Sequence, residues 1–249
     1  MYNYFNQKTT EDFSPENVEA MYDQGFVFTR IGRGVMQQIR SVRIDLEKFD
    51  LTSENRRILR KVDKFKVGKF EVPYGGYDWT IGKLAKDFYD SRGADFSANK
   101  IKEILTSDKS NFNTLFTYTE DDAEIPLGYA ICFETENILH YAYPFFDHIH
   151  YPKDTSMAMM LEAIEYAKKT NKKYIYLGSL SQYKTQFKGF EWFDVGDTDK
   201  HVRETRIKTD GEGIDKNEEG QINKDDGCWS NDIEKAKTVL TLLKLKGNL

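Results

Sequence analysis

The chain has 249 residues, a formal net charge of -5 and two cysteines. This length suits one large domain or two closely packed lobes, and it is enough to bury a substantial core without disulfides. Cys132 and Cys228 stand at no metal-ligand spacing, so the sequence predicts neither a secreted disulfide framework nor a zinc site. That use of cysteine favours a reducing compartment.

The N-terminal segment is polar and acidic, and it lacks the basic and apolar regions of a signal peptide. No apolar run approaches the roughly 20 residues that cross a bilayer, and the mean hydropathy is -0.67. We therefore expect a soluble, cytoplasmic protein without a membrane partner.

Charge is unevenly distributed along the chain. From Arg30 to Lys69 there are 12 Lys and Arg against 5 Asp and Glu, whereas the rest of the chain has 24 against 36. A basic segment in an acidic protein is the footprint of contact with a polyanion. A solvated basic helix face is the alternative that charge alone leaves open.

Residues 25–46 alternate between apolar and polar side chains, which predicts strands with a turn at Gly32 and Gly34. A helix follows, capped by Thr52 or Ser53. Its first two turns carry four cations, which oppose the helix macrodipole and are tolerated more easily beside a polyanion. These cations are Arg56, Arg57, Arg60 and Lys61.

The remaining elements have the spacing of a mixed sheet flanked by helices. Two helices are expected between residues 77 and 105, and then three antiparallel strands within 114–146. A helix beginning at Asp154 or Thr155 and ending near Asn171 leads to a strand that ends at Gly178, followed by a loop and another strand. This order predicts an α+β (α/β) protein with the GNAT-like acyltransferase fold and an N-terminal β-rich and helical lobe.

We expect three regions in the chain. Residues 1–110 would form the N-terminal lobe and residues 111–200 the GNAT-like lobe. Residues 201–249 would hold a charged loop and a C-terminal amphipathic helix capped by Ser230 or Asn231.

Two separated blocks carry a family resemblance. The first runs from the strands near Gly25 through the R-I-D of Arg43 to the S-x-x-R-R-x-x-R pattern of Ser53 to Arg60. The second holds an aromatic pair before Asp147, a Tyr-x-Leu-Gly-like strand end at Tyr176 to Gly178, and Lys188. Together these blocks resemble the arginyl-tRNA and leucyl-tRNA protein transferases over most of residues 20 to 195.

The chain also departs from that family. Gln37, Gln38, Ile39 and Ser41 replace the N-terminal cysteine pairs that the family associates with metal or cluster binding. A transferase of this kind would work without a metal or resident cofactor, with aminoacyl-tRNA as co-substrate. His148 stands where proline is usual, and Gly189 to Glu191 replace an arginine-rich segment.

The resemblance implies transfer of Arg or Leu from charged tRNA to the N-terminal α-amine of a target protein or peptide, as in the N-degron pathway. Asp147 would hold the ammonium or take its proton, and the backbone at Gly178 and Ser179 would stabilise the oxyanion. The alternatives are that Asp147 caps a turn and that Gly178 only ends a strand.

The predicted binding residues form a second group. The α-helical arginines would contact phosphates, or else the acidic N-terminal side chain of a target. Tyr183 and Lys184 would contact the tRNA terminus by stacking and charge. The predicted substrate and tRNA set consists of Arg43, Arg56, Arg57, Arg60, Tyr176, Tyr183, Lys184 and Lys188, and no contact with DNA is expected.

Three other functions compete with this one. An acetyl-CoA-dependent acetyltransferase would use the same fold, but the segment PKDTSMAMM lacks the glycines that cradle a pyrophosphate. A peptidoglycan-branching transferase of the Fem type would need a helical arm that the sequence does not contain. A non-catalytic RNA- or peptide-binding protein is the third. His140, His148, His150 and His201 form no metal set.

Overall fold

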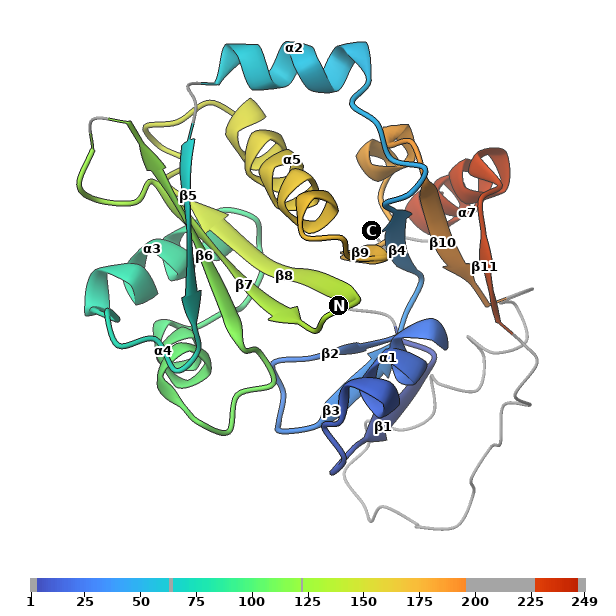
Figure 1. Cartoon of the computed structure of the whole chain (residues 1–249), viewed down its shortest axis with the longest axis horizontal. Helices are drawn as coiled ribbons and strands as arrows, with labels where there is room; N and C mark the ends of the chain where they lie inside the picture. The colour runs from blue at the N-terminus through green and yellow to red at the C-terminus, as the bar shows by residue number, and fades with distance from the viewer. Residues whose placement is uncertain (1–3, 63–64, 122, 196–226, 246–249) are drawn as a thin grey trace.

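A computed structural model describes residues 4–62, 65–121, 123–195 and 227–245 of the chain (Figure 1). The charged loop expected from about Val202 to Gly227 lies outside these residues except for Gly227, and so does His201.

The core of the molecule is an eight-stranded mixed sheet in the order β11-β10-β4-β9-β8-β7-β6-β5. Strands β8 and β9 pair in parallel, and the other described neighbours pair antiparallel. The strands are β4 (Ser41–Asp45), β5 (Phe65–Glu71), β6 (Thr114–Glu120), β7 (Gly128–Glu134), β8 (Ile138–Phe146), β9 (Tyr174–Ser179), β10 (Phe190–Asp194) and β11 (Cys228–Ser230).

A smaller sheet lies beside it, with the order β1-β3-β2, and helix α1 belongs to the same region (Figure 1). Its elements are β1 (Asn6–Thr9), α1 (Pro15–Asp23), β2 (Phe26–Phe28) and β3 (Val35–Gln38). Strand β2 is buried throughout because its three apolar residues pack into the common core.

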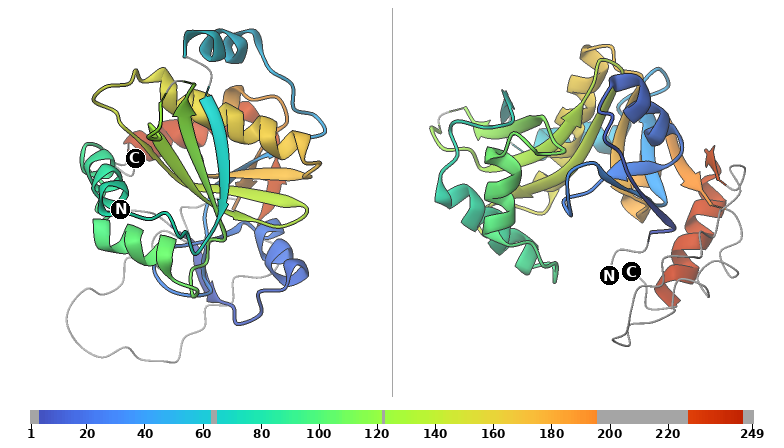
Figure 2. Two further views of the ribbon diagram at one scale, coloured as in Figure 1. Left: turned by 60° about the vertical axis from the view of Figure 1, so that its left-hand side comes forward. Right: turned by 90° about the horizontal axis from the view of Figure 1, so that it is seen from below.

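Helices cover both faces of the large sheet. Figure 2 shows α3 (Trp79–Asp90) and α4 (Ala98–Thr106) on one side of the sheet and α5 (Asp154–Lys169) on the other. Helix α2 (Ser53–Lys61) lies across the start of α5, and α7 (Ile233–Leu245) packs near the short 3₁₀ helix η1 (Gln182–Gln186). In the described residues, none of the helices combines the length and the apolar character needed to span a membrane.

The structure confirms the predicted fold class. Strands lie where the alternation in residues 25–46 predicts them, three antiparallel strands lie within 114–146, and the order β6-β7-β8-α5-β9 is that of the GNAT-like layout. Helix α2 begins with a capping box in which the side chain of Thr52 accepts from the backbone N–H of Asn55. Such caps contribute on the order of 1 kcal/mol.

Two predicted helix caps are wrong. Helix α7 is capped by Asp232, whose carboxylate accepts from the backbone N–H of Lys235, because the chain before it is taken up by β11. Helix α5 begins at Asp154 after Lys153, and no side chain caps it.

The three predicted regions share one sheet. Strands β4 and β5 come from residues 1–110 and β11 comes from residues 201–249, yet all three pair with strands of residues 111–200. The division into 1–110, 111–200 and 201–249 stays a prediction.

Candidate functional site

Strands β8 and β9 part from each other after a short parallel ladder. They pair at three positions, the last of which joins His140 to Tyr176. Beyond it, residues 141–146 of β8 stay paired with β7, while Ser179 of β9 pairs with β4. We call the gap between residues 141–146 and 177–179 the fork. Strands that part leave backbone N–H and C=O groups outside the ladder, so the fork is a candidate site.

The side chain of Lys184 bridges two backbone carbonyls on the β9 side of the fork. Its Nζ atom donates hydrogen bonds to the backbone oxygens of Leu177 (2.7 Å) and Ser179 (2.6 Å), and the side chain is buried. Burial lowers the pKa of Lys184 to about 7.

Gly178 lies between the two carbonyls that Lys184 holds. Its φ of +74° is in the left-handed region that favours glycine, and no heavy atom lies within 4 Å of the place where a Cβ would stand. Lys184 and Gly178 therefore fix the shape of the β9 end and leave open space beside it.

The predicted catalytic residues follow two neighbouring strands. Asp147 stands seven residues beyond His140, roughly 20 Å along the chain, whereas Ser179 stands three residues beyond Tyr176, roughly 10 Å. Asp147 therefore lies at the outer end, or mouth, of the fork, further along β8 than Gly178 and Ser179 lie along β9. The catalytic roles of these three residues stay predictions.

Asp147 caps the turn that leads to α5, as one of the two sequence interpretations expects. Its Oδ1 atom accepts from the backbone N–H groups of Ile149 and His150, and its Oδ2 atom lies 2.6 Å from Nδ1 of His150. Burial alone would raise the pKa of Asp147, but the hydrogen bonds from His150 and Ile149 outweigh it and lower the pKa. Asp147 is thus a weak base that keeps its negative charge.

The cations of α2 lie on an exposed helix beside the start of α5 (Figure 1). The Nζ atom of Lys61 stands 3.4 Å from the Asp154 carboxylate at the first residue of α5. Arg57 pairs with Glu54, and Arg56 donates to the backbone oxygen of Leu51 at 2.6 Å. The helix thus presents its basic face to solvent near the mouth of the fork.

Arg43 is buried inside the sheet. Its guanidinium donates to Glu191 (2.8 Å) and Asp23 (3.0 Å), and it lies 3.8 Å from the ring centroid of Tyr174 and 4.0 Å from that of Trp229. The side chain is 8% exposed. Arg43 therefore holds β4, β9, β10 and β11 together, and this packing leaves no face of the guanidinium for tRNA.

The other predicted binding residues differ in exposure. Tyr176 is fully buried, with its hydroxyl beside Arg43 and Asp23. Lys184 is buried as well, so its predicted contact with the tRNA terminus does not fit its surroundings. Tyr183 is 47% exposed, and the exposed Lys188 pairs with Asp50 at 3.2 Å. The tRNA roles of these residues stay predictions.

A buried polar pair that the sequence did not indicate lies at the closed end of the fork. The hydroxyl of Tyr22 stands 2.8 Å from Nδ1 of His140, and the backbone N–H of Phe28 donates to the same hydroxyl at 3.3 Å. Burial, and then the positive charge of Lys184, lower the pKa of His140 to about 3, so its imidazole is neutral. No local pattern reveals this pair, because Tyr22 and His140 are far apart in the chain.

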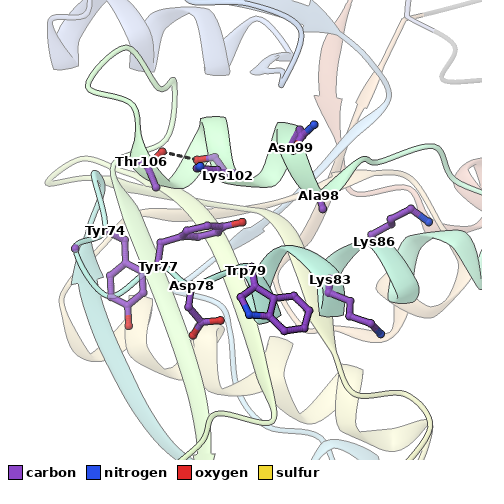
Figure 3. A pocket seen from close by; sticks show the side chains of 11 residues that line it. Tyr74, Tyr77, Asp78, Trp79, Lys83, Lys86, Ala98, Asn99, Lys102 and Thr106 are labelled. Carbon is purple, nitrogen blue, oxygen red and sulfur yellow. Dashed lines mark hydrogen bonds between the residues drawn. The ribbon is translucent and has the colours of Figure 1, made fainter.

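A separate hollow lies between α3 and α4 (Figure 3). It has a volume of about 740 Å³, and Trp79 at its rim is 71% exposed. Lys83 pairs with Asp87 at 2.6 Å and Lys86 pairs with Asp90, so the lysines along α3 are balanced by acids. We call this hollow the α3–α4 groove.

The described residues contain no group of three His, Cys, Asp or Glu side chains that is arranged for a metal ion.

No family model matches the chain, and no curated protein matches its sequence. Among solved structures, L-PGS from Bacillus licheniformis is similar at 12% identity and a TM-score of 0.42, over 66% of this chain and 52% of that one. The C-terminal domain of a putative lysylphosphatidylglycerol synthetase from Agrobacterium fabrum is similar at 13% identity and a TM-score of 0.42, over 70% of this chain and 55% of that one.

A GCN5-related glucosamine N-acetyltransferase region of a fungal multi-domain β-N-acetylglucosaminidase is similar at 9% identity and a TM-score of 0.41. That match covers 74% of this chain and 22% of the fungal one. The chain thus spans about half the length of the first two proteins. Likenesses of this size carry no argument about function, and the resemblance to the arginyl and leucyl transferases stays a prediction.

Proposed function

We propose that the chain is an acyltransferase that takes an amino acid, Arg or Leu, from charged tRNA and passes it to the N-terminal α-amine of a protein or peptide. The proposal rests on where the cations of α2 lie relative to the start of α5. In this fold an acetyl-CoA-dependent enzyme holds pyrophosphate at the start of the helix that α5 represents. Here the cations stand on α2 instead, beside that start.

The start of α5 is poorly suited to a pyrophosphate. Its first residue is Asp154, a carboxylate that repels phosphate at the place where backbone N–H groups would bind it, and no glycine allows close approach. Arg56, Arg57 and Arg60 lie along an exposed helix, which suits an extended row of phosphates better than a single pyrophosphate. An RNA backbone is the polyanion that this arrangement favours.

The fork supplies the place for the acyl group. An α-amine has a pKa near 8, so roughly a tenth of it is neutral at pH 7 without any help. The main tasks are therefore to hold the ester and the amine together and to stabilise the oxyanion. In this proposal the acyl group lies in the fork beside Gly178, and Asp147 at the mouth attracts the ammonium of the incoming peptide.

The test is transfer of radiolabelled Arg or Leu from charged tRNA to peptides that begin with Asp, Glu, Arg or Lys. Acetylation of the same peptides by acetyl-CoA is measured in parallel. Asp147→Asn is the test variant, and Asp121→Asn, which removes an exposed carboxylate in the turn after β6, is the matched control.

We expect one class of peptide to receive label from one aminoacyl-tRNA. Asp147→Asn should raise KM for the peptide about tenfold, while Asp121→Asn leaves KM unchanged. Acetylation in place of aminoacyl transfer, or no turnover in either assay, would contradict the proposal and favour an acetyltransferase or a binding protein.

A further inference from the structure

The α3–α4 groove has an exposed aromatic side chain at its rim and cations on both walls (Figure 3). Its volume of about 740 Å³ lies within the roughly 300–1,000 Å³ of pockets that hold small organic ligands. The indole of Trp79 is 71% exposed, so it forgoes most of the free energy that burial of an aromatic ring provides. A ligand that covers this indole gains that free energy.

Trp79 shares one face of α3 with two lysines. Trp79, Lys83 and Lys86 stand at positions i, i+4 and i+7 of the helix, and all three line the groove. Along the helix axis Lys83 lies roughly 6 Å and Lys86 roughly 10 Å beyond Trp79. A nucleotide has a comparable span between its base and its phosphates. This face of α3 therefore offers a flat apolar surface at one end and ammonium groups further along.

The wall formed by α4 adds a third ammonium group and an amide. Asn99 and Lys102 stand at positions i and i+3 of that helix, and both line the groove. Lys102 forms no ion pair with the residues that the structure describes, so its charge is available to an anion. The amide of Asn99 can donate to the edge of a base and accept from it.

The carboxylates near the groove leave its lysines open to an anion. Lys83 and Lys86 pair with Asp87 and Asp90, four residues further along α3, and the two lysine side chains remain 62% and 50% exposed. Exposed pairs of this kind stabilise a protein very little, and an ammonium group has three N–H donors. Asp78 also lines the groove, but its carboxylate is engaged as the N-cap of α3. A phosphate group can therefore bind beside the lysines.

We propose that the groove binds a free nucleotide, a nucleoside diphosphate or triphosphate, with its base stacked on the indole of Trp79 and its phosphates beside the lysines of the two walls. Stacking on an aromatic ring together with phosphate contacts from lysines is how proteins hold nucleotide units. A single nucleotide fits better than an RNA strand, because Tyr74 and Tyr77, the other aromatic lining residues, are half-buried and leave one exposed stacking surface. This binding site is separate from the fork and does not depend on the proposed function.

Isothermal titration calorimetry with ADP and with inorganic pyrophosphate tests the two parts of the site. Trp79→Ala should weaken ADP binding about tenfold or more, because the stacking of the base is lost, and should leave pyrophosphate binding within about twofold. Replacing Lys83, Lys86 and Lys102 together by methionine should weaken the binding of both ligands about tenfold or more. All four side chains are exposed, so these variants should fold as the wild type does.

A matched variant controls for the loss of charge. Replacing Lys66, Lys237 and Lys244 by methionine removes the same number of positive charges from exposed positions of β5 and α7. We expect this variant to bind ADP and pyrophosphate with the wild-type affinities.

Tryptophan fluorescence supplies a test on the wild-type chain. Of the three tryptophans, Trp192 is fully buried and Trp229 is half-buried against the guanidinium of Arg43. Quenching by acrylamide therefore reports mainly on Trp79, and ADP should reduce this quenching.

A failure of ADP to bind, or to protect Trp79 from acrylamide, would overturn the inference. So would an equal loss of ADP affinity in the control lysine variant, because it would show a general attraction of anions to the protein. Tighter binding of single-stranded oligoadenylate than of ADP would overturn it in favour of an RNA strand. Binding of a glutamate-rich peptide in place of ADP, weakened by Trp79→Ala, would overturn it in favour of an acidic protein segment.

Discussion

The fork and the α3–α4 groove differ in how their charged and polar side chains are buried. The groove is an open hollow with an exposed indole and several lysines, but the lysines along α3 are paired with acids of the same helix. The β9 side of the fork holds the buried amine of Lys184, and the buried imidazole of His140 lies at the last pair of β8 and β9. Burying such polar groups costs free energy, and this cost is the reason why the proposed function uses the fork and not the groove.

The largest expected effect is a loss of folding stability in the variant Lys184→Met. Methionine fills the same space but donates no hydrogen bond, so the backbone oxygens of Leu177 and Ser179 lose the donor that Lys184 supplies. Each such group costs about 1–3 kcal/mol. Urea denaturation should show the free energy of unfolding reduced by about 2–4 kcal/mol. Lys102→Met in the groove is the control and should change it by less than about 0.5 kcal/mol.

The next effect concerns the cations of α2. Replacing Arg56, Arg57 and Arg60 together by alanine should weaken tRNA binding about tenfold or more at 0.15 M salt, and should reduce the slope of log K against log salt by about 2. Filter binding over a salt series measures both quantities. The matched variant replaces Lys83, Lys86 and Lys102 in the groove. If it weakens tRNA binding as much as the α2 variant does, the arginines of α2 are not a preferred tRNA-binding surface.

A smaller effect comes from the titration of Lys184. Its pKa in the folded protein is about 7, below the ordinary value of 10.5, so above pH 7 the unfolded chain binds more protons at this residue than the folded one. Stability must then rise with pH in this range, with a slope of at most about 1.4 kcal/mol per pH unit. We expect wild type to gain stability over Lys184→Met between pH 7 and 9. A constant difference would show that Lys184 stays charged in the fold.

The smallest effect is expected at Trp79. The indole at the rim of the groove is 71% exposed, so Trp79→Ala removes little buried surface. Thermal unfolding should change by less than about 0.5 kcal/mol, and labelled transfer should stay at the wild-type rate. A loss of transfer here would mean that the groove takes part in the reaction.

Strands with regular apolar–polar alternation and helices with a clear capping residue could be predicted from the sequence. Alternation placed β2, β3 and β4, and the Thr52 capping signal placed α2. Strand β5 was missed because its lysines and its glycine hide the alternation on an edge strand whose residues are all partly or fully exposed. Strand β11 was missed because its three residues are too few to show a period.

The site was less predictable than the fold. Gly178 was recognised at the end of a strand, where it lies in the structure. Lys184 was predicted to contact the tRNA terminus by its charge, but its burial depends on carbonyls that only the folded loop brings near. The pair of Tyr22 and His140 joins residues 118 positions apart, so no local pattern could reveal it.

The place of β4 in the large sheet has a consequence for how the protein is made. This strand, at residues 41–45, lies between β9 and β10, which belong to residues 174–194. On the ribosome β4 must therefore wait without its sheet neighbours until nearly the whole described body has been synthesised. A nascent chain halted before residue 174 has no partner for β4, and we expect it to recruit chaperones that the finished protein does not need.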